Sequence, residues 1–413
     1  MKHFKRLTTT AFVAAFAALS LARANDELPS VAEMWKIIQQ QQVEIDALKG
    51  RLGSTEVKVE ATDAKVEATG AYVENLGASG GAAPAGDAWY TSTQIGGYGE
   101  LHANFGANDE IDFHRFVLYA GHDFNDTTRF FSEIELEHSI AGEGKAGEFE
   151  LEQAFLEFDI DETSKARAGL FLLPIGIMNE THEPDTFYGV ERNLVEKNII
   201  PSTWWEAGAA YNKEYENGVS FDAAIHSGLS TPISGSKAFN IRSGRQKVAK
   251  AKADDLASTV RVTYAGIPGV KFGLSAQYQQ DLAQGLLSET VDATLVSAHM
   301  DYERDGFGLR ALYARWDLGG AAPAVLGVDE QFGYYIEPSY RFGTEAGDIG
   351  VFARYSAYDN QANSAFDTED SFIDLGLNFW PTQQIVLKAD VQFTDFANKR
   401  DEEILNLGVG YQF

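Results

Sequence analysis

The sequence predicts an all-β transmembrane fold, a closed barrel of sixteen antiparallel strands, preceded by a trimeric α-helical coiled coil. Residues 31–76 carry an unbroken heptad pattern. Residues 89–413 contain segments of about ten residues in which apolar and polar side chains alternate. Short turns and longer loops follow one another between these segments, as is typical of strands that cross a membrane and return.

The composition excludes several classes of protein. The 413-residue chain has 61 Asp and Glu against 33 Lys and Arg, a formal net charge of −28. Such an acidic surface repels phosphates, so we expect no nucleic-acid partner. The absence of cysteine excludes thiol nucleophiles, cysteine zinc sites and disulfides. Beyond the N-terminus, no apolar run of about 18 residues predicts a membrane-spanning helix.

Residues 1–24 are predicted to be a signal peptide. A basic start is followed by an apolar stretch at 7–21 and by an A-x-A sequence at 22–24. We expect cleavage before Asn25. A short membrane anchor is the alternative, but polar and acidic sequence follows at once.

Residues 25–77 are predicted to form a periplasmic coiled coil, and the Gly/Ala/Pro-rich residues 78–88 a flexible linker. The two apolar seams alternate by three and four residues, and β-branched residues in both favour three strands over two. A lone amphipathic helix lying on the surface of a domain is the alternative, but the six or more heptads here exceed what a single surface helix needs. The seams are Val31, Ile38, Ile45, Leu52, Val59, Val66 and Val73, and Met34, Gln41, Leu48, Thr55, Thr62, Thr69 and Leu76.

Residues 89–413 are predicted to form the barrel. In 270–279, for example, Phe272, Leu274 and Tyr278 alternate with polar residues. Short turns are assigned to the periplasm and longer loops to the exterior, which predicts a bacterial outer-membrane location. Aromatic residues near strand ends are expected at the membrane interfaces: Trp89, Tyr90, Trp204, Trp205, Trp316 and Trp380. The strands are centred near residues 100, 117, 133, 153, 168, 208, 222, 260, 275, 297, 311, 336, 352, 375, 389 and 407.

Four stretches of the sequence carry two resemblances. The end of the chain, EILNLGVGYQF, resembles the assembly signal of bacterial outer-membrane proteins. The segment ARAGLFLLPIGIMNE (166–180), the Glu-Arg pair at 191–192 and WWEAGAAY (204–211) resemble the phosphate-selective porin O/P family. The resemblance implies a trimeric porin of sixteen strands. It also implies that the third external loop, 174–203, folds inward as the constriction. That loop carries Glu180, His182, Glu183, Asp185, Glu191 and Arg192.

Charged residues on the inward faces of the strands are predicted to line an aqueous pore. Any one of them alone fits a solvated residue of the barrel wall with no specific role, but together they indicate an aqueous channel rather than a packed core. They are Arg129, Glu133, Glu135, Arg167, Arg261, Lys271, Arg310, Arg354, Lys388 and Asp390.

The acidic residues in and beside one external loop predict a cation site. Oxygen-rich loops suit Ca²⁺ or Mg²⁺, which also bridge lipopolysaccharide phosphates, although solvated charge is the alternative. The candidate ligands are Asp359, Asp367, Glu369 and Asp370. No other cofactor is predicted. We expect no enzyme activity, because His182-Glu183 lacks the helix-spaced histidine of a zinc protease and GGYGELH near Gly96 lacks a following helix.

The predicted function is passive diffusion of small hydrophilic solutes and ions across the outer membrane. Beyond residue 88 the chain has 50 acidic and 24 basic residues, which favours weak cation selectivity. Anion or phosphate selectivity, as in the resembled family, is the alternative. A different class of function also stays open: an envelope tether, with the coil reaching peptidoglycan and the barrel as its anchor.

Overall fold

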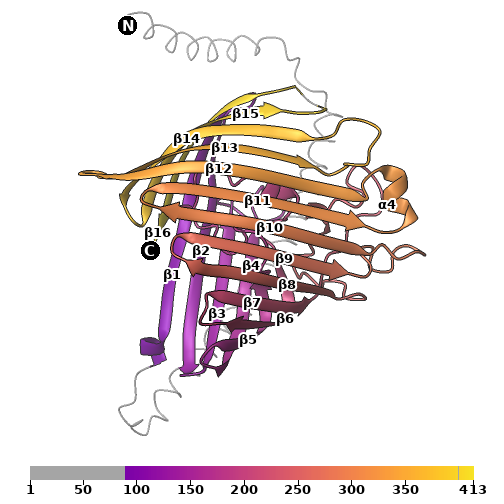
Figure 1. Cartoon of the computed structure of the whole chain (residues 1–413), viewed down its shortest axis with the longest axis horizontal. Helices are drawn as coiled ribbons and strands as arrows, with labels where there is room; N and C mark the ends of the chain where they lie inside the picture. The colour runs from indigo at the N-terminus through magenta and orange to yellow at the C-terminus, as the bar shows by residue number, and fades with distance from the viewer. Residues whose placement is uncertain (1–88, 399) are drawn as a thin grey trace, which may run out of the picture. The chain divides into compact units, whose positions relative to one another are not determined.

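The computed structural model describes residues 89–398 and 400–413, which form a closed antiparallel barrel (Figure 1). The last strand, β16, closes the wall by pairing with the first, β1, with Tyr98 opposite Gln412 and Phe105 opposite Leu405. The predicted signal peptide, coiled coil and linker lie outside the described residues. The predicted barrel is confirmed.

Every predicted strand centre falls within an observed strand. The strands are β1 Thr93–Phe105, β2 Glu110–Asn125, β3 Thr128–Glu137, β4 Phe149–Asp161, β5 Ser164–Leu172, β6 Trp205–Glu214, β7 Val219–His226, β8 Ala257–Ile267, β9 Val270–Gln279, β10 Ala293–Arg304, β11 Phe307–Leu318, β12 Glu330–Thr344, β13 Gly347–Asp359, β14 Asp370–Thr382, β15 Ile385–Asp395 and β16 Glu403–Gln412.

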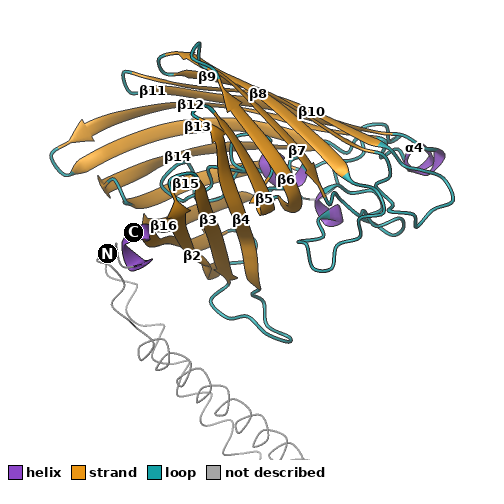
Figure 2. Cartoon of the chain, turned by 90° about the horizontal axis from the view of Figure 1, so that it is seen from below, coloured by secondary structure: helices purple, strands orange, loops and turns teal. Residues whose placement is uncertain are grey.

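Short turns and long loops alternate around the barrel, as predicted. The two longest connections, 173–204 between β5 and β6 and 227–256 between β7 and β8, leave the same end of the strands. The longer loops gather at that end (Figure 2). The short helices are η1 Trp89–Ser92, α3 Val195–Asn198, η2 Arg242–Gly244 and α4 Ala321–Leu326. Among the described residues, no helix combines the length and the apolar character needed to cross a bilayer.

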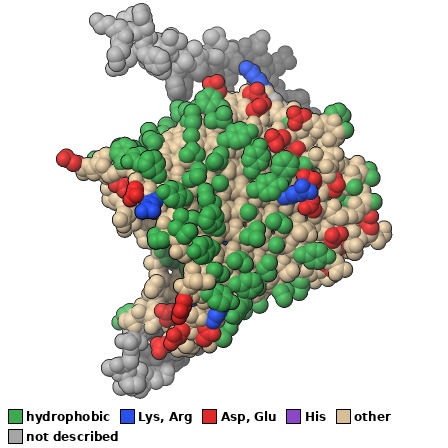
Figure 3. Space-filling model, in the orientation of Figure 1, with side chains coloured by type: hydrophobic (Ala, Val, Ile, Leu, Met, Phe, Trp, Pro, Cys, Tyr) green, Lys and Arg blue, Asp and Glu red, His purple; other side chains and the backbone are tan. Residues whose placement is uncertain are grey.

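The outer face of the barrel is apolar, and the alternation in the strands accounts for it. In β9, Leu274 is 57% exposed, whereas its neighbour Ser275 is 1% exposed. Hydrophobic side chains accordingly cover much of the outer face in view, with charged side chains mostly toward its ends (Figure 3). An apolar outer face suits lipid, and closure leaves no unpaired strand edge in a medium without hydrogen-bond partners.

The interior has two chemically different sides. An apolar cluster fills the long-loop end between β5 and β12, and loop residues join wall residues in it. The other side, along β1–β4 and β13–β16, is polar and charged. The cluster includes Phe171, Leu173, Ile175, Val195, Ile199, Ile200, Trp204, Leu229, Phe239, Leu295, Leu312 and Trp316.

The predicted aromatic girdle is wrong for four of its members. Trp204, Trp205, Trp316 and Trp380 are buried inside the barrel. The indole nitrogen of Trp316 donates to the carbonyl of Ile199 at 2.9 Å, since a buried indole requires an acceptor. The sequence indicates this inward position, because Trp316 has the same strand parity as Arg310, which is predicted to line the pore.

Candidate functional site

The loop 173–204 lies inside the barrel and crosses to the opposite wall. Its backbone is held by side chains of four distant strands, β11, β13, β14 and β15. Arg310, Arg354 and Asn378 donate to the carbonyls of Thr186 (3.1 Å), Tyr188 (2.6 Å) and Phe187 (3.0 Å), and the Val190 amide donates to Asp390 (2.7 Å).

Glycines on the inward face of β16 make room for this loop. A Cβ at Gly410 would lie 2.4 Å from Cβ of Pro184, and one at Gly408 would lie 3.1 Å from Cγ1 of Val190. A larger side chain at either position would displace the loop, so the wall is shaped to receive it.

Several residues predicted to line the pore face inward but are covered by the loop. Arg354 pairs with Glu337 at 2.6 Å, and Nζ of Lys388 lies 3.5 Å from the centre of the Phe187 ring. The carboxylate of Glu133 accepts from the Tyr98 hydroxyl at 3.1 Å. With Glu135 and Asp390, these residues are buried. Strand parity predicted their face correctly, but only the folded loop covers them.

The remaining predicted wall cations are mostly paired with acids. Arg129 and Arg167 both contact Glu157, at 2.6 and 2.7 Å. Arg261 bridges Asp222, at 2.8 Å, and Glu180 of the loop. Arg310 lies 3.3 Å from Asp301. Lys271 is exposed near the short-turn end of β9.

The charged residues predicted on the loop have well-defined partners. Nε2 of His182 lies 2.9 Å from the Tyr98 hydroxyl, and burial lowers the pKa of His182 well below its ordinary value. Burial raises the pKa of Glu183. Glu191 lies 2.9 Å from Nδ1 of His102; burial opposes its charge, but this contact holds the pKa of Glu191 low. Asp185 accepts from Gln412 at 2.5 Å.

A cavity of about 260 Å³ lies between the loop and the polar wall. Arg192, Lys197 and Arg242 line it together with acids and histidines. These three bases and Arg245 make no ion pair with any described residue, and Nη1 of Arg192 and Nε of Arg245 are buried without a hydrogen-bond partner there. Burial and the charges of Arg245 and Arg192 lower the pKa of Arg242 to about 9.

The sequence alone did not identify Arg242 and Arg245 as part of the site. They belong to the loop 227–256, which packs on the loop 173–204. Arg242 donates to the carbonyl of Lys197 at 2.7 Å, and Arg245 to that of Thr203 at 2.6 Å. No local pattern connects residues so far apart in the chain.

The acids of the predicted cation site lie on or beside the loop between β13 and β14. Asp359 accepts from the Gln361 amide at 2.7 Å and the Thr368 hydroxyl at 2.8 Å. Burial and the charges of Asp359 and Asp367 raise the pKa of Glu369. Asp370 accepts from Tyr358 at 3.3 Å. A Ca²⁺ or Mg²⁺ site there stays a prediction. Within the described part of the chain, ligand atoms of three residues approach one another closely in two other groups.

Comparison with known proteins locates the chain among its relatives. No family model matches it. An uncharacterised protein of Aquifex aeolicus (strain VF5) is 30% identical over 370 residues, 81% of this chain and 83% of the relative.

Solved structures show the fold. An anion-selective porin from Comamonas acidovorans has a TM-score of 0.56 at 12% identity, covering 78% of this chain and 99% of that one. Pseudomonas putida OprB has a TM-score of 0.53 at 12% identity, covering 78% and 94%. The trimer form of the outer membrane protein OmpT of Vibrio cholerae has a TM-score of 0.52 at 10% identity, covering 78% and 99%. The chain therefore has the barrel fold of outer-membrane porins.

Proposed function

The chain belongs to the same family as the Aquifex aeolicus protein, and we propose that it is an outer-membrane porin, a passive diffusion channel for small hydrophilic solutes and ions. The loop 173–204 forms its constriction. One observation carries this proposal: the loop is held across the lumen by side chains from four strands, in a barrel that is apolar outside and charged within. A barrel that served only as an anchor would have no need of a charged interior.

Conductance of the purified full-length protein in planar bilayers tests the proposal. We expect stepwise current increments as single assemblies insert. The envelope-tethering alternative, in which the predicted coil reaches peptidoglycan and the barrel is its anchor, predicts no current. A folded protein that inserts but does not conduct would contradict the channel and favour the tether.

We propose a homotrimer, for which the predicted coil supplies part of the association energy. The solved trimer of similar fold supports this state. Replacing Ile38, Ile45 and Leu52 together by Ala removes three apolar layers, each contributing about 2–5 kcal/mol at most. We expect the trimer to dissociate at a lower temperature in detergent. Alanine replacements at the non-seam positions Gln39, Asp46 and Ser54 are the control. An unchanged temperature in the seam variant would show that the coil does not contribute.

We propose a weak preference for cations, because acids outnumber bases two to one beyond residue 88 and most wall arginines are paired with acids. Counter-ions concentrate where like charges line a narrow path. The reversal potential in a KCl gradient measures this preference, and we expect the sign of a cation-selective channel.

Anion selectivity is a second candidate, and the unpaired bases around the 260 Å³ cavity favour it. A reversal potential of the opposite sign would establish it. Arg242→Gln should then reduce the anion preference, whereas Arg167→Gln should change it less, because Arg167 is already paired with Glu157.

A further inference from the structure

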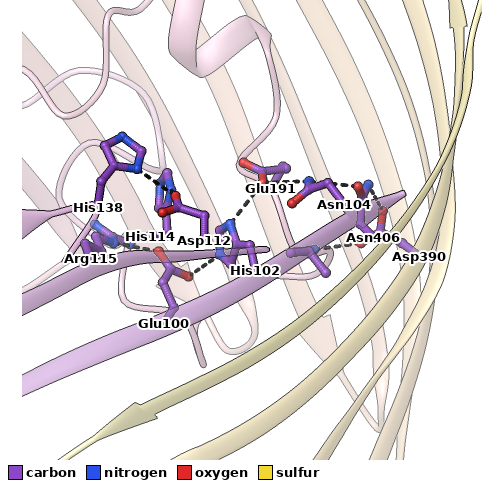
Figure 4. A network of polar contacts seen from close by, with 11 residues as sticks. Glu100, His102, Asn104, Asp112, His114, Arg115, His138, Glu191, Asp390 and Asn406 are labelled. Carbon is purple, nitrogen blue, oxygen red and sulfur yellow. Dashed lines mark hydrogen bonds and ion pairs between the residues drawn. The ribbon is translucent and has the colours of Figure 1, made fainter. Parts of the chain in front are cut away.

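Three residues with metal-binding side chains meet on the lumen wall where β2 and β3 reach the long-loop end. Asp112 and His114 lie on β2, and His138 directly follows β3. Oδ2 of Asp112 lies 2.7 Å from Nδ1 of His138 and 3.4 Å from Nδ1 of His114 (Figure 4). One ligand atom from each residue lies within 4.8 Å of the other two.

A β-bulge explains how these side chains come together. Glu100 of β1 pairs with Arg115, but His102, only two residues on, pairs with Asp112, so β2 has one extra residue at this point. A bulge of this kind changes the direction of side chains and interrupts strict alternation. It accounts for His114 and Arg115, adjacent in sequence, both contributing to the lumen side.

The position of His138 is fixed by the backbone. Its amide donates to the carbonyl of His114 at 3.1 Å. His138 and Ser139 both have positive φ angles, 53° and 58°, a conformation that residues other than glycine adopt at a cost and that is concentrated at functional sites.

The surroundings admit an ion and water. His114 and His138 line the 260 Å³ cavity with Glu137 and Glu191. The ring of His102 stacks on that of His114 with centroids 4.5 Å apart. The cavity is lined by the carboxylates of Glu100, Glu137, Glu191 and Glu196 as well as by the bases Arg192, Lys197 and Arg242.

We propose that Asp112, His114 and His138 bind a divalent transition-metal ion of the zinc class, with water from the cavity completing its coordination. Two imidazoles and one carboxylate suit Zn²⁺ and its neighbours in the first transition row better than Ca²⁺ or Mg²⁺, which prefer oxygen ligands alone. Three protein ligands leave the fourth coordination position of the ion open to water. The site is distinct from the predicted Ca²⁺ or Mg²⁺ site, and binding to it does not depend on whether the barrel conducts.

Isothermal titration calorimetry of Zn²⁺ into the untagged full-length protein in detergent tests the proposal. We expect saturable binding that is lost or weakened in His114→Ala and in His138→Ala. The loss should exceed the roughly 10–100-fold typical of removing an outer-shell partner. His122→Ala is the matched control, because His122 lies on the same strand toward its other end, 2.8 Å from Oγ1 of Thr93, and it should bind as the wild type does.

Two further variants keep the test decisive. Asp112→Asn removes the carboxylate charge with almost no change of shape, so it tests the site even if the histidine variants do not fold. It should also weaken Zn²⁺ binding. Glu152→Gln alters the second three-residue group, Glu133, Glu152 and His182, and it should bind Zn²⁺ normally. No saturable binding by the wild type, equal binding by the folded Asp112 and His114 variants, or loss of binding in Glu152→Gln would each overturn the proposal.

Discussion

Replacing residues 184–190 by a three-residue Gly-Ser-Gly linker is expected to raise single-channel conductance about twofold or more, since the current through an aqueous pore follows its open cross-section. These residues hold the loop against the far wall. The carbonyls of Thr186 and Tyr188 accept hydrogen bonds from side chains of β11 and β13, and the amide of Val190 donates to a side chain of β15. Without these residues the loop loses its contacts with the far wall, and larger solutes should also pass.

A similar shortening elsewhere separates constriction from general damage to the barrel. The loop between β13 and β14 can be shortened at residues 362–366, where Phe366 is 80% exposed. This shortening should leave the single-channel conductance near the wild-type value. Both variants should keep the heat-dependent gel migration of a folded barrel. Unchanged conductance in a folded 184–190 variant would show that this loop does not limit the current.

Trp316→Ala is expected to lower the free energy of unfolding by about 3–5 kcal/mol, as truncating a large buried aromatic side chain does. Trp316 is fully buried. Its ring packs against that of Trp204 with centroids 6.2 Å apart, and its indole nitrogen donates to Ile199 at 2.9 Å. The variant therefore loses packing from the apolar cluster and one anchor of the loop 173–204. Thermal unfolding in detergent, followed by circular dichroism, measures the loss.

Two variants separate the contributions to this loss. Trp316→Phe keeps most of the packing but loses the hydrogen bond to Ile199. It should therefore lower the free energy of unfolding by less than Trp316→Ala does, by about 1–3 kcal/mol, because the carbonyl is left unpaired. Tyr313→Ala removes an aromatic ring from the same strand, but Tyr313 is 43% exposed on the outer face. Detergent replaces its contacts, and we expect only a small change. Equal losses for Trp316→Ala and Tyr313→Ala would mean that the interior cluster adds no stability.

The sequence by itself determined the wall of the barrel. In β9 and β15 the alternation of apolar and polar residues predicts the faces that the structure shows, with Ser275 and Lys388 inward and Leu274 and Leu387 outward. Side-chain direction in a strand has a period of two residues, and lipid demands an apolar outer face and a closed sheet. These constraints act locally or uniformly, so a single sequence can express them. The inward loop was predicted from its length and a family resemblance.

Only the tertiary structure decided what fills the lumen. The bulge in β2, which gives the lumen both His114 and Arg115, depends on the pairing of two strands and leaves no mark in the alternation of either. Arg242 meets Arg192 only because two loops pack together. Lys388 was predicted to line water, but the Phe187 ring covers its ammonium group. Such contacts join residues far apart in the chain, and their energies depend on packing between elements, which local periodicity does not contain.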